Sequence, residues 1–320
     1  MRQLIEANPT NQAAIFPYIG GEEVNTSPTH AHRRHVVNFG ERSEEESRVR
    51  WPELMAIVEA KVKPERITKD AKKYPRMVNE WWKYWNARQE LQSAIAGLER
   101  VLVINCGATP HASFTFLPTR MVFANTLAVI AKDTHAAFCA LQSRPHELWA
   151  RFFGSSMKDD LRYTPSDCFE TFPFPEGFET HPDLEVAGQA YYDFRAALMV
   201  ENDEGLTKTY NRFHDPKERD PKIERLRELH TAMDRAVLDA YGWTDLEPTC
   251  EFLLDYEIDE ETWSPRKKKP YRYRWPAPLH YEVLARLLEL NAQRAKEEAR
   301  LGATATKKRS PSSKAQSKSK

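Results

Sequence analysis

Side chains suited to reading and holding a nucleic acid occur in three stretches of the chain. The first is a polar turn that leads through two arginines into an expected strand, the second is the segment 109–125, and the third flanks a small-residue turn at 154–156. Together they supply the candidate DNA-binding residues Arg33, Arg34, His111, Ser113, Thr115, Arg120, Arg151, Lys158 and Arg162. An arginine that bonds two acceptors of guanine gives about 1–3 kcal/mol of discrimination, whereas cations and exposed backbone amides bind phosphate without reading sequence.

The strand expected within the second stretch alternates in character. Ser113 and Thr115 fall on one face, and Phe114 and Phe116 fall on the other. We therefore expect the phenylalanines to pack inward and the hydroxyls to face outward, toward a base edge. The alternatives are an exposed basic turn in the first stretch, a solvated strand face in the second and ordinary helix C-terminal cations in the third.

Two aromatic-rich segments and one histidine-rich segment each have a possible binding role and a structural alternative. Trp81, Trp82, Tyr84 and Trp85 suggest base stacking, but a cluster this dense is more often core or interdomain packing. In 266–275 cations alternate with aromatics, which suits a nucleic-acid backbone, although the acidic stretch 255–262 is an alternative intramolecular partner. The histidines between positions 30 and 35 have no neighbouring cysteine or well-spaced carboxylate, so we expect no metal.

The motifs of a DNA methyltransferase are missing from this sequence. Such an enzyme takes the target base out of the stack and holds it in its catalytic pocket, which in adenine-N6 enzymes contains an Asn/Asp-Pro-Pro-Tyr/Phe tetrapeptide. Asn8-Pro9-Thr10 and Phe16-Pro17-Tyr18 both depart from that pattern. Gly20-Gly21-Glu22-Glu23 indicates a polar hairpin turn rather than a nucleotide-binding loop. We therefore expect neither catalysis nor a bound cofactor in this chain.

Composition sets the outer limits. The 320 residues are 41% hydrophobic, enough for a sizeable core and, by length, about two domains. The 47 basic and 47 acidic residues balance, so global charge indicates no polyanion partner, while a local basic face remains compatible with DNA. The four scattered cysteines and the lack of a long apolar run predict a cytoplasmic protein without a membrane partner.

The pattern of elements divides the chain in three. Short apolar runs predict strands at 35–39, 100–105, 113–118 and 127–131, and helices are expected at 51–62, 79–98 and 134–154. After the Pro-rich segment 171–178, apolar spacing of three and four predicts helices at 184–202, 221–242 and 279–301. The fold class is therefore α+β: a mixed domain 1–178, a mostly helical domain 179–301 and a basic, low-complexity, disordered tail 302–320.

Several segments resemble one known family. The runs Pro17 to Gly40, Val62 to Arg66, Glu80 to Arg88 and Tyr163 to Pro175 are similar to the target-recognition region of MmeI-type restriction–modification enzymes. Those enzymes are single-chain adenine-N6 DNA methyltransferases, often fused to a nuclease. The segments 207–216, 225–243 and 282–295 resemble the helical carboxy-terminal domain of the same family.

The resemblance implies the DNA sequence-recognition part of a site-specific methyltransferase. In the family, recognition residues precede the Phe123-Ala124-Asn125 element, and the combination of Trp85 with Arg88 is kept. Double-stranded DNA is then the ligand, and S-adenosylmethionine belongs to a methyltransferase domain or subunit encoded upstream. Two alternatives stay open, namely a module that docks a methyltransferase or nuclease, and a free-standing DNA-binding protein without catalysis.

Overall fold

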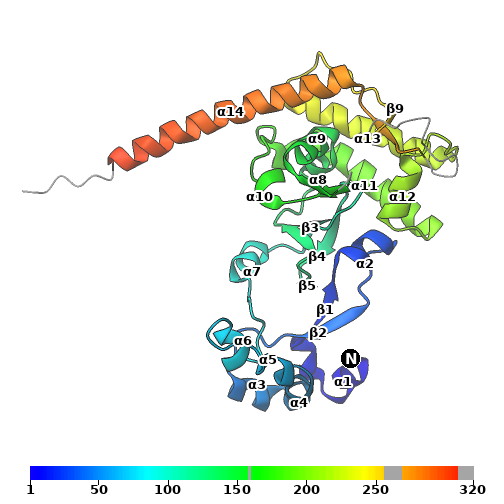
Figure 1. Ribbon diagram of the computed structural model, residues 1–320. Helices are drawn as coiled ribbons and strands as arrows, with labels where there is room; N and C mark the ends of the chain where they lie inside the picture. Colours follow the sequence, from blue (N-terminus) through cyan, green and yellow to red (C-terminus); the bar gives the residue numbers. More distant parts are fainter. Residues whose placement is uncertain (158–159, 256–268, 309–320) are drawn as a thin grey trace, which may run out of the picture.

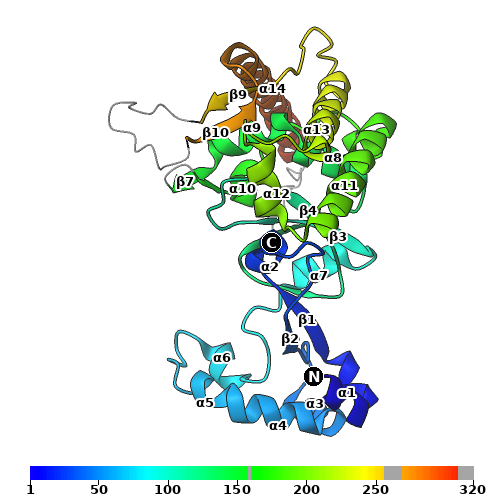
Figure 2. The ribbon, with the colours of Figure 1, turned by 90° about the vertical axis from the view of Figure 1, so that its right-hand side faces the viewer.

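The structure is a computed structural model that describes residues 1–157, 160–255 and 269–308. It combines many helices with four small sheets in these ranges, which confirms the α+β class expected from the sequence. A small lobe (residues 1–14 and 38–86) lies below a larger main body, and the last helix extends past that body (Figures 1 and 2). Among the residues described, no helix combines the length and apolar character needed to cross a membrane.

The small lobe consists of short helices around a core of its own. They are α1 (Arg2–Ala7), the 3-10 helix η1 (Pro9–Ala13), α3 (Glu44–Arg50), α4 (Pro52–Lys61), α5 (Lys63–Arg66) and α6 (Pro75–Asn79). Four of these helices have proline in their first turn, where the missing N–H leaves no hydrogen bond unmade. Buried Trp51 donates its Nε1–H to the Thr10 carbonyl at 2.8 Å and so joins α4 to η1. The core consists of Ala14, Ile15, Phe39, Trp51, Leu54, Met55, Val58 and Trp81.

Of two three-stranded sheets, the first joins this lobe to the main body and the second lies within the main body. In the first, β1 (Ile15–Ile19) pairs antiparallel with β2 (Arg34–Val37) and parallel with β5 (Val122–Phe123). In the second, β3 (Arg100–Asn105) lies between β4 (Phe114–Pro118) and β6 (Leu127–Ile130), antiparallel to both. All four strands expected from apolar runs are therefore present, and β1 and β5 are additional.

Three local predictions are wrong. The hairpin turn expected at Gly20 to Glu23 is the start of helix α2 (Gly21–Thr26), because Glu23 Oε2 accepts the Gly20 N–H at 3.1 Å and caps the first turn. The helix expected over 79–98 is interrupted at 80–88, and only α7 (Gln89–Ile95) follows. The helix expected over 134–154 is two helices, α8 (His135–Gln142) and α9 (Arg144–Phe153), since Pro145 begins a new helix.

The rest of the main body is mostly helical. It contains β7 (Ser155–Met157), β8 (Asp160–Arg162), α10 (Pro165–Cys168), the 3-10 helix η2 (Phe178–Thr180), α11 (Pro182–Asn202), α12 (Leu206–Phe213), α13 (Pro221–Ala240), β9 (Glu251–Leu254), β10 (Tyr271–Arg274) and α14 (Ala277–Lys308). Gly242, at φ +77°, ends the segment after α13 as its sequence position predicts. The α14 helix continues beyond its expected end at Leu301, and residues 309–320 of the predicted tail lie outside the described residues.

The main core crosses the Pro-rich segment 171–178. Helix α8 packs against α11 and α13, and the contact between α8 and α11 is close at Gly188. A Cβ at Gly188 would stand 2.1 Å from the His135 carbonyl oxygen, so only glycine fits there without a shift of the backbone. The domain boundaries at 178 and 301 stay predictions.

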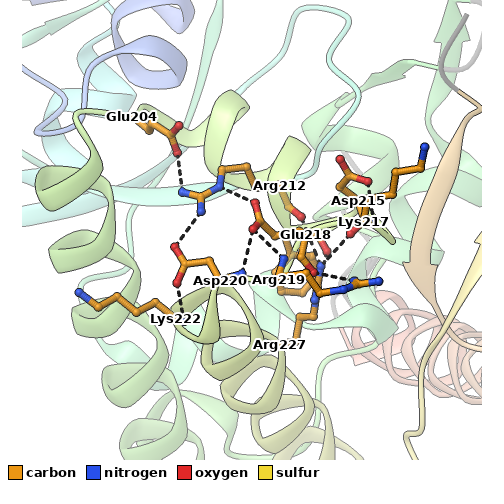
Figure 3. Close-up of polar contacts among 10 residues, drawn as sticks. Glu204, Arg212, Asp215, Lys217, Glu218, Arg219, Asp220, Lys222 and Arg227 are labelled. Carbon is orange, nitrogen blue, oxygen red and sulfur yellow. Dashed lines mark hydrogen bonds and ion pairs between the residues drawn. The ribbon is translucent and has the colours of Figure 1, made fainter.

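A charged network fixes the turn between α12 and α13 (Figure 3). The Arg212 guanidinium lies between three carboxylates, at 3.3 Å from Glu204, 2.7 Å from Glu218 and 2.8 Å from Asp220. Asp220 also accepts the Lys222 N–H at 2.8 Å and caps α13. The hydrogen bond from Arg212 is the main reason that the pKa of Glu218 falls to about 2.

Candidate nucleic-acid interface

A groove lies between the edge of the first sheet and the linker that leaves the small lobe. We call it the hinge groove, and its volume is about 520 Å³. Its lining is rich in side-chain amides and contains one arginine. The lining residues are Tyr18, Asn38, Gly40, Glu41, Tyr84, Asn86, Ala87, Arg88, Gln89, Leu91, Gln92, Val122, Phe123, Ala124 and Asn125.

Two arginines of the small lobe hold the linker wall of this groove. Arg66 donates Nη1–H to the carbonyls of Trp81, at 3.0 Å, and Lys83. Arg76 donates Nε–H to the Tyr84 carbonyl at 3.1 Å. These bonds satisfy carbonyls that an uninterrupted helix would have paired with its own N–H groups, which explains the break at 80–88.

The linker then turns sharply at Arg88. This residue has φ 47° and ψ 48°, a left-handed conformation that costs an L-residue roughly 1–2 kcal/mol. Asn86 Oδ1 accepts the Arg88 N–H at 3.0 Å and supports the turn. Strained backbone of this kind concentrates at functional sites, so the turn marks this wall of the groove as a candidate binding element.

The chemistry of the groove matches the acceptors and donors on base edges. Asn86, Gln89, Gln92 and Asn125 are exposed, and each amide offers both a donor and an acceptor, as adenine requires. Exposed Arg88 forms no ion pair with a described residue, which leaves its five N–H donors free for a ligand. Burial raises the pKa of Tyr84 to about 12, so its hydroxyl stays protonated and can donate.

Arg34 contacts this groove through the lining residue Tyr18. Its guanidinium stands 4.8 Å from the Tyr18 ring centroid and donates to Glu23 Oε1 from Nη2 at 2.9 Å and from Nε at 3.2 Å. Glu23 is buried whereas the Arg34 side chain is exposed, so this arginine is a surface cation held in place by a buried carboxylate. Arg33 is exposed, and among the described residues its one ion pair is with Glu22, with 3.7 Å between Nη1 and Oε1. Such a weakly held cation suits a phosphate contact better than Arg34 does.

The expectation that Ser113 and Thr115 face outward is wrong. Both are buried, and so are Phe114 and Phe116, because both faces of β4 are covered. The Thr115 hydroxyl lies 3.2 Å from the Tyr192 hydroxyl, a partner on α11. These hydroxyls cannot reach a base edge in this conformation.

His111 is also an interior residue. Its Nε2 lies 2.8 Å from Asn211 Oδ1, and its ring stacks on His214 with 5.1 Å between centroids. Burial lowers the pKa of His111 to about 4, so the ring is neutral near pH 7. It joins β4 to α12 and lies away from solvent.

The remaining predicted cations lie apart from one another. Exposed Arg120, after β4, borders a recess of about 340 Å³ beside Arg50. Arg151 is held within the body, by Glu147 at 2.9 Å and the Pro110 carbonyl at 2.8 Å. Arg162 is exposed at the end of β8, and Lys158 lies outside the described residues. Arg33, Arg34, Arg120 and Arg162 are therefore the predicted arginines that are exposed, and Arg34 differs from the others in its ion pair with a buried carboxylate.

The second basic segment is partly internal. Arg272 is buried, donates to Asp255 Oδ2 at 3.1 Å and to the Pro110 carbonyl at 2.8 Å, so the intramolecular alternative holds for this residue. Trp275 belongs to a buried cluster with Trp149. Residues 266–268 of this segment lie outside the described residues.

Sequence reasoning missed the amides of the hinge groove. Asn86 precedes Arg88 by two positions, the spacing at which an asparagine side chain caps a turn, and this was the available signal. Asn38 gives the same signal, since its Oδ1 accepts the Gly40 N–H at 2.9 Å. Asn125 lies two residues after the end of β5 and offered no comparable local pattern.

Comparison with known proteins finds a matching family and similar solved structures. The family described as "MmeI, target recognition domain" matches residues 1–176. The solved structure of the Type IIL restriction–modification enzyme MmeI in complex with DNA superimposes with a TM-score of 0.58 at 19% sequence identity. That superposition covers 92% of this chain and 33% of the MmeI chain, so this chain spans about a third of the length of MmeI. A search of curated proteins gave no match.

Proposed function

Because the chain belongs to the MmeI target recognition domain family, we propose that it recognises a specific sequence in double-stranded DNA as part of a restriction–modification enzyme. The observation that carries this proposal is that the hinge groove lies wholly within the family-matched residues 1–176. Its amides and its unpaired arginine are the side-chain types that discriminate between base pairs in a major groove.

We assign base reading to Arg88 and Asn125, which line the groove from opposite walls. Arg88 fits guanine, because its fork of donors matches the O6 and N7 acceptors. Asn125 fits adenine, because one amide can donate to N7 and accept from N6. Arg33 and Arg120 supply phosphate contacts that hold the duplex in register without reading it.

The chemistry that follows recognition belongs to another part of the enzyme. We propose a methyltransferase domain or subunit, encoded upstream, that binds S-adenosylmethionine and methylates an adenine at N6 within or beside the recognised site. The target base must leave the stack to reach such an active site. Recognition by this chain would then fix the duplex while the base is extruded.

The test selects binding sites from random duplex DNA with and without the methyltransferase part, over a salt series. We expect one enriched sequence in the complete mixture and methylation of an adenine in that sequence when methyl donor is added. Arg88→Ala should weaken binding to the enriched site about 10- to 100-fold and relax the preference at one base pair. Arg225→Ala is the matched control, since Arg225 is exposed on α13 and pairs only with Glu228 at 2.7 Å among described residues.

The outcomes separate the alternatives. Binding to the methyltransferase part without sequence enrichment would overturn recognition and favour a docking module. Enrichment by the chain alone, with no methylation in the complete mixture, would favour a free-standing DNA-binding protein.

A further inference from the structure

A second recess opens on the outer side of the same linker. We call it the outer recess, and its volume is about 570 Å³. It shares the residues 86–89 and Leu91 with the hinge groove. Trp85 and a second arginine, Arg76, line the outer recess alone. Its lining residues are Arg76, Trp85, Asn86, Ala87, Arg88, Gln89, Glu90 and Leu91.

Trp85 is unlike its neighbouring tryptophans. Trp81 is 5% exposed in the core of the small lobe, and Trp82 donates Nε1–H to the Arg42 carbonyl at 3.0 Å beside it. Trp85 is 53% exposed. Core packing therefore accounts for the first two tryptophans and leaves the exposure of the third without an intramolecular reason.

The ring of Trp85 is exposed but held in place. Tyr74 contacts it edge to face, with 6.1 Å between ring centroids. The preceding carbonyl, that of Tyr84, is fixed by Arg76, and the left-handed turn at Arg88 follows. An aromatic ring presented on a fixed backbone loses little conformational entropy when a ligand stacks on it.

The lining of the recess suits a ligand with a flat ring. Arg76 and Arg88 line it, whereas Glu90 is the acidic side chain in its lining. Arg76 is itself paired with Glu41, at 2.5 Å, and with Glu80, at 3.5 Å, so carboxylates already balance its charge. An aromatic face beside a cation is the arrangement that single-stranded nucleic acid binds, by stacking of bases and contact with the backbone.

We propose that Trp85 stacks on a nucleobase of bound DNA that has left the duplex stack. The inference rests on the proposed function, since extrusion of a target adenine leaves a partner base unpaired in the same duplex. Trp85 then stabilises the distorted duplex, and it reads no sequence because every base has a stacking face.

The test uses the full chain with the methyltransferase part and the enriched duplex. Trp85→Ala should weaken binding about 5- to 100-fold, Trp85→Phe should retain most of the affinity, and both should keep the unfolding midpoint because the side chain is exposed. With 2-aminopurine at the position opposite the target adenine, wild-type protein should quench the fluorescence of the unstacked probe, and Trp85→Ala should not. Trp243→Phe is the control, since Trp243 stacks on Tyr241 at 4.4 Å in the main body.

Three results would overturn the inference, and they differ in what they leave standing. Equal affinity and equal quenching for wild type and Trp85→Ala would remove the stacking role while site-specific recognition remains. Loss of methyltransferase association in Trp85→Ala without DNA would make Trp85 a protein contact. Failure of the wild-type mixture to enrich any sequence would remove the proposed function and this inference together.

Discussion

Arg144 at the start of α9 and Asp234 in the middle of α13 form a buried ion pair. Arg144 donates Nη1–H to Asp234 Oδ2 and its backbone N–H to Asp234 Oδ1 at 2.9 Å. Burial alone would raise the pKa of Asp234, but the Arg144 guanidinium and His230 outweigh it and hold that pKa below its usual value. The pair joins helices on opposite sides of the Pro-rich segment 171–178, so the two predicted domains share a charged interior contact.

Removal of this carboxylate should strongly destabilise the fold. Asp234→Ala leaves the Arg144 charge buried without its partner, and we expect a loss of about 3–5 kcal/mol in the free energy of unfolding. Urea unfolding of the two proteins measures it. Asp239→Ala is the control on the same helix, since Asp239 is half exposed and pairs with Arg235 at 2.8 Å, a type of pair worth about 1 kcal/mol or less. Similar losses for both variants would contradict the interpretation.

Stability should fall in mild acid because of buried histidines. Burial lowers the pKa of His146 to about 3 and that of His111 to about 4, from an ordinary 6.5. The folded chain keeps both rings neutral while the unfolded chain binds protons below pH 6.5, so stability present above pH 6.5 is lost as the pH falls toward 4 and then 3. Each histidine adds about 1.4 kcal/mol per pH unit to the slope in that window.

His146→Phe isolates one of these contributions. The free energy of unfolding of the variant should fall less steeply with acidification, by one proton's share, than that of wild type. Urea unfolding at a series of pH values between neutral and mildly acidic measures both slopes. Parallel curves for the two proteins would show that His146 does not titrate between the folded and unfolded states.

Arg120 should contribute to DNA affinity without contributing to specificity. It is exposed beside a recess that Arg50 also lines, the position of a phosphate-contacting cation. Arg120→Ala should reduce the slope of log binding constant against log salt by about 0.9 and weaken all duplexes alike. Fluorescence anisotropy over a salt series, with Arg225→Ala for comparison, measures it. A change in the preferred sequence would instead place Arg120 at a base edge.

The elements that sequence reasoning placed correctly are those in which local pattern and tertiary burial agree. Residues 100–105 and 127–130 are apolar runs between turns and become β3 and β6, and α11 and α13 keep their apolar spacing through long helices. Predictions from sequence are wrong where a residue distant in sequence determines whether a side chain is buried. Thr115 is buried because Tyr192, far along the chain, supplies the hydrogen bond that its hydroxyl needs.

The candidate site was the least predictable part for the same reason. Segment 80–88 has the composition of a helix, but Arg66 and Arg76 bond its carbonyls and expose Trp85 and Arg88 on a turn. Arg34 has the sequence position of a DNA-facing cation, but the buried carboxylate of Glu23 holds it. Hydrogen bonds and ion pairs of this kind decide which side chains are exposed and which N–H donors can meet a ligand. Their partners are distant in sequence, so local patterns do not predict them.

Strand β1 contributes to two hydrophobic cores. Ile15 packs in the core of the small lobe, and Ile19 packs in the core of the main body. A one-residue insertion in this strand would turn one of the two isoleucines toward solvent and rotate one lobe against the other. The exposed stretch 67–73 has no such role and tolerates changes in length. Variants of this protein should therefore differ in length in the loops of the small lobe, whereas the length of strand β1 should stay constant.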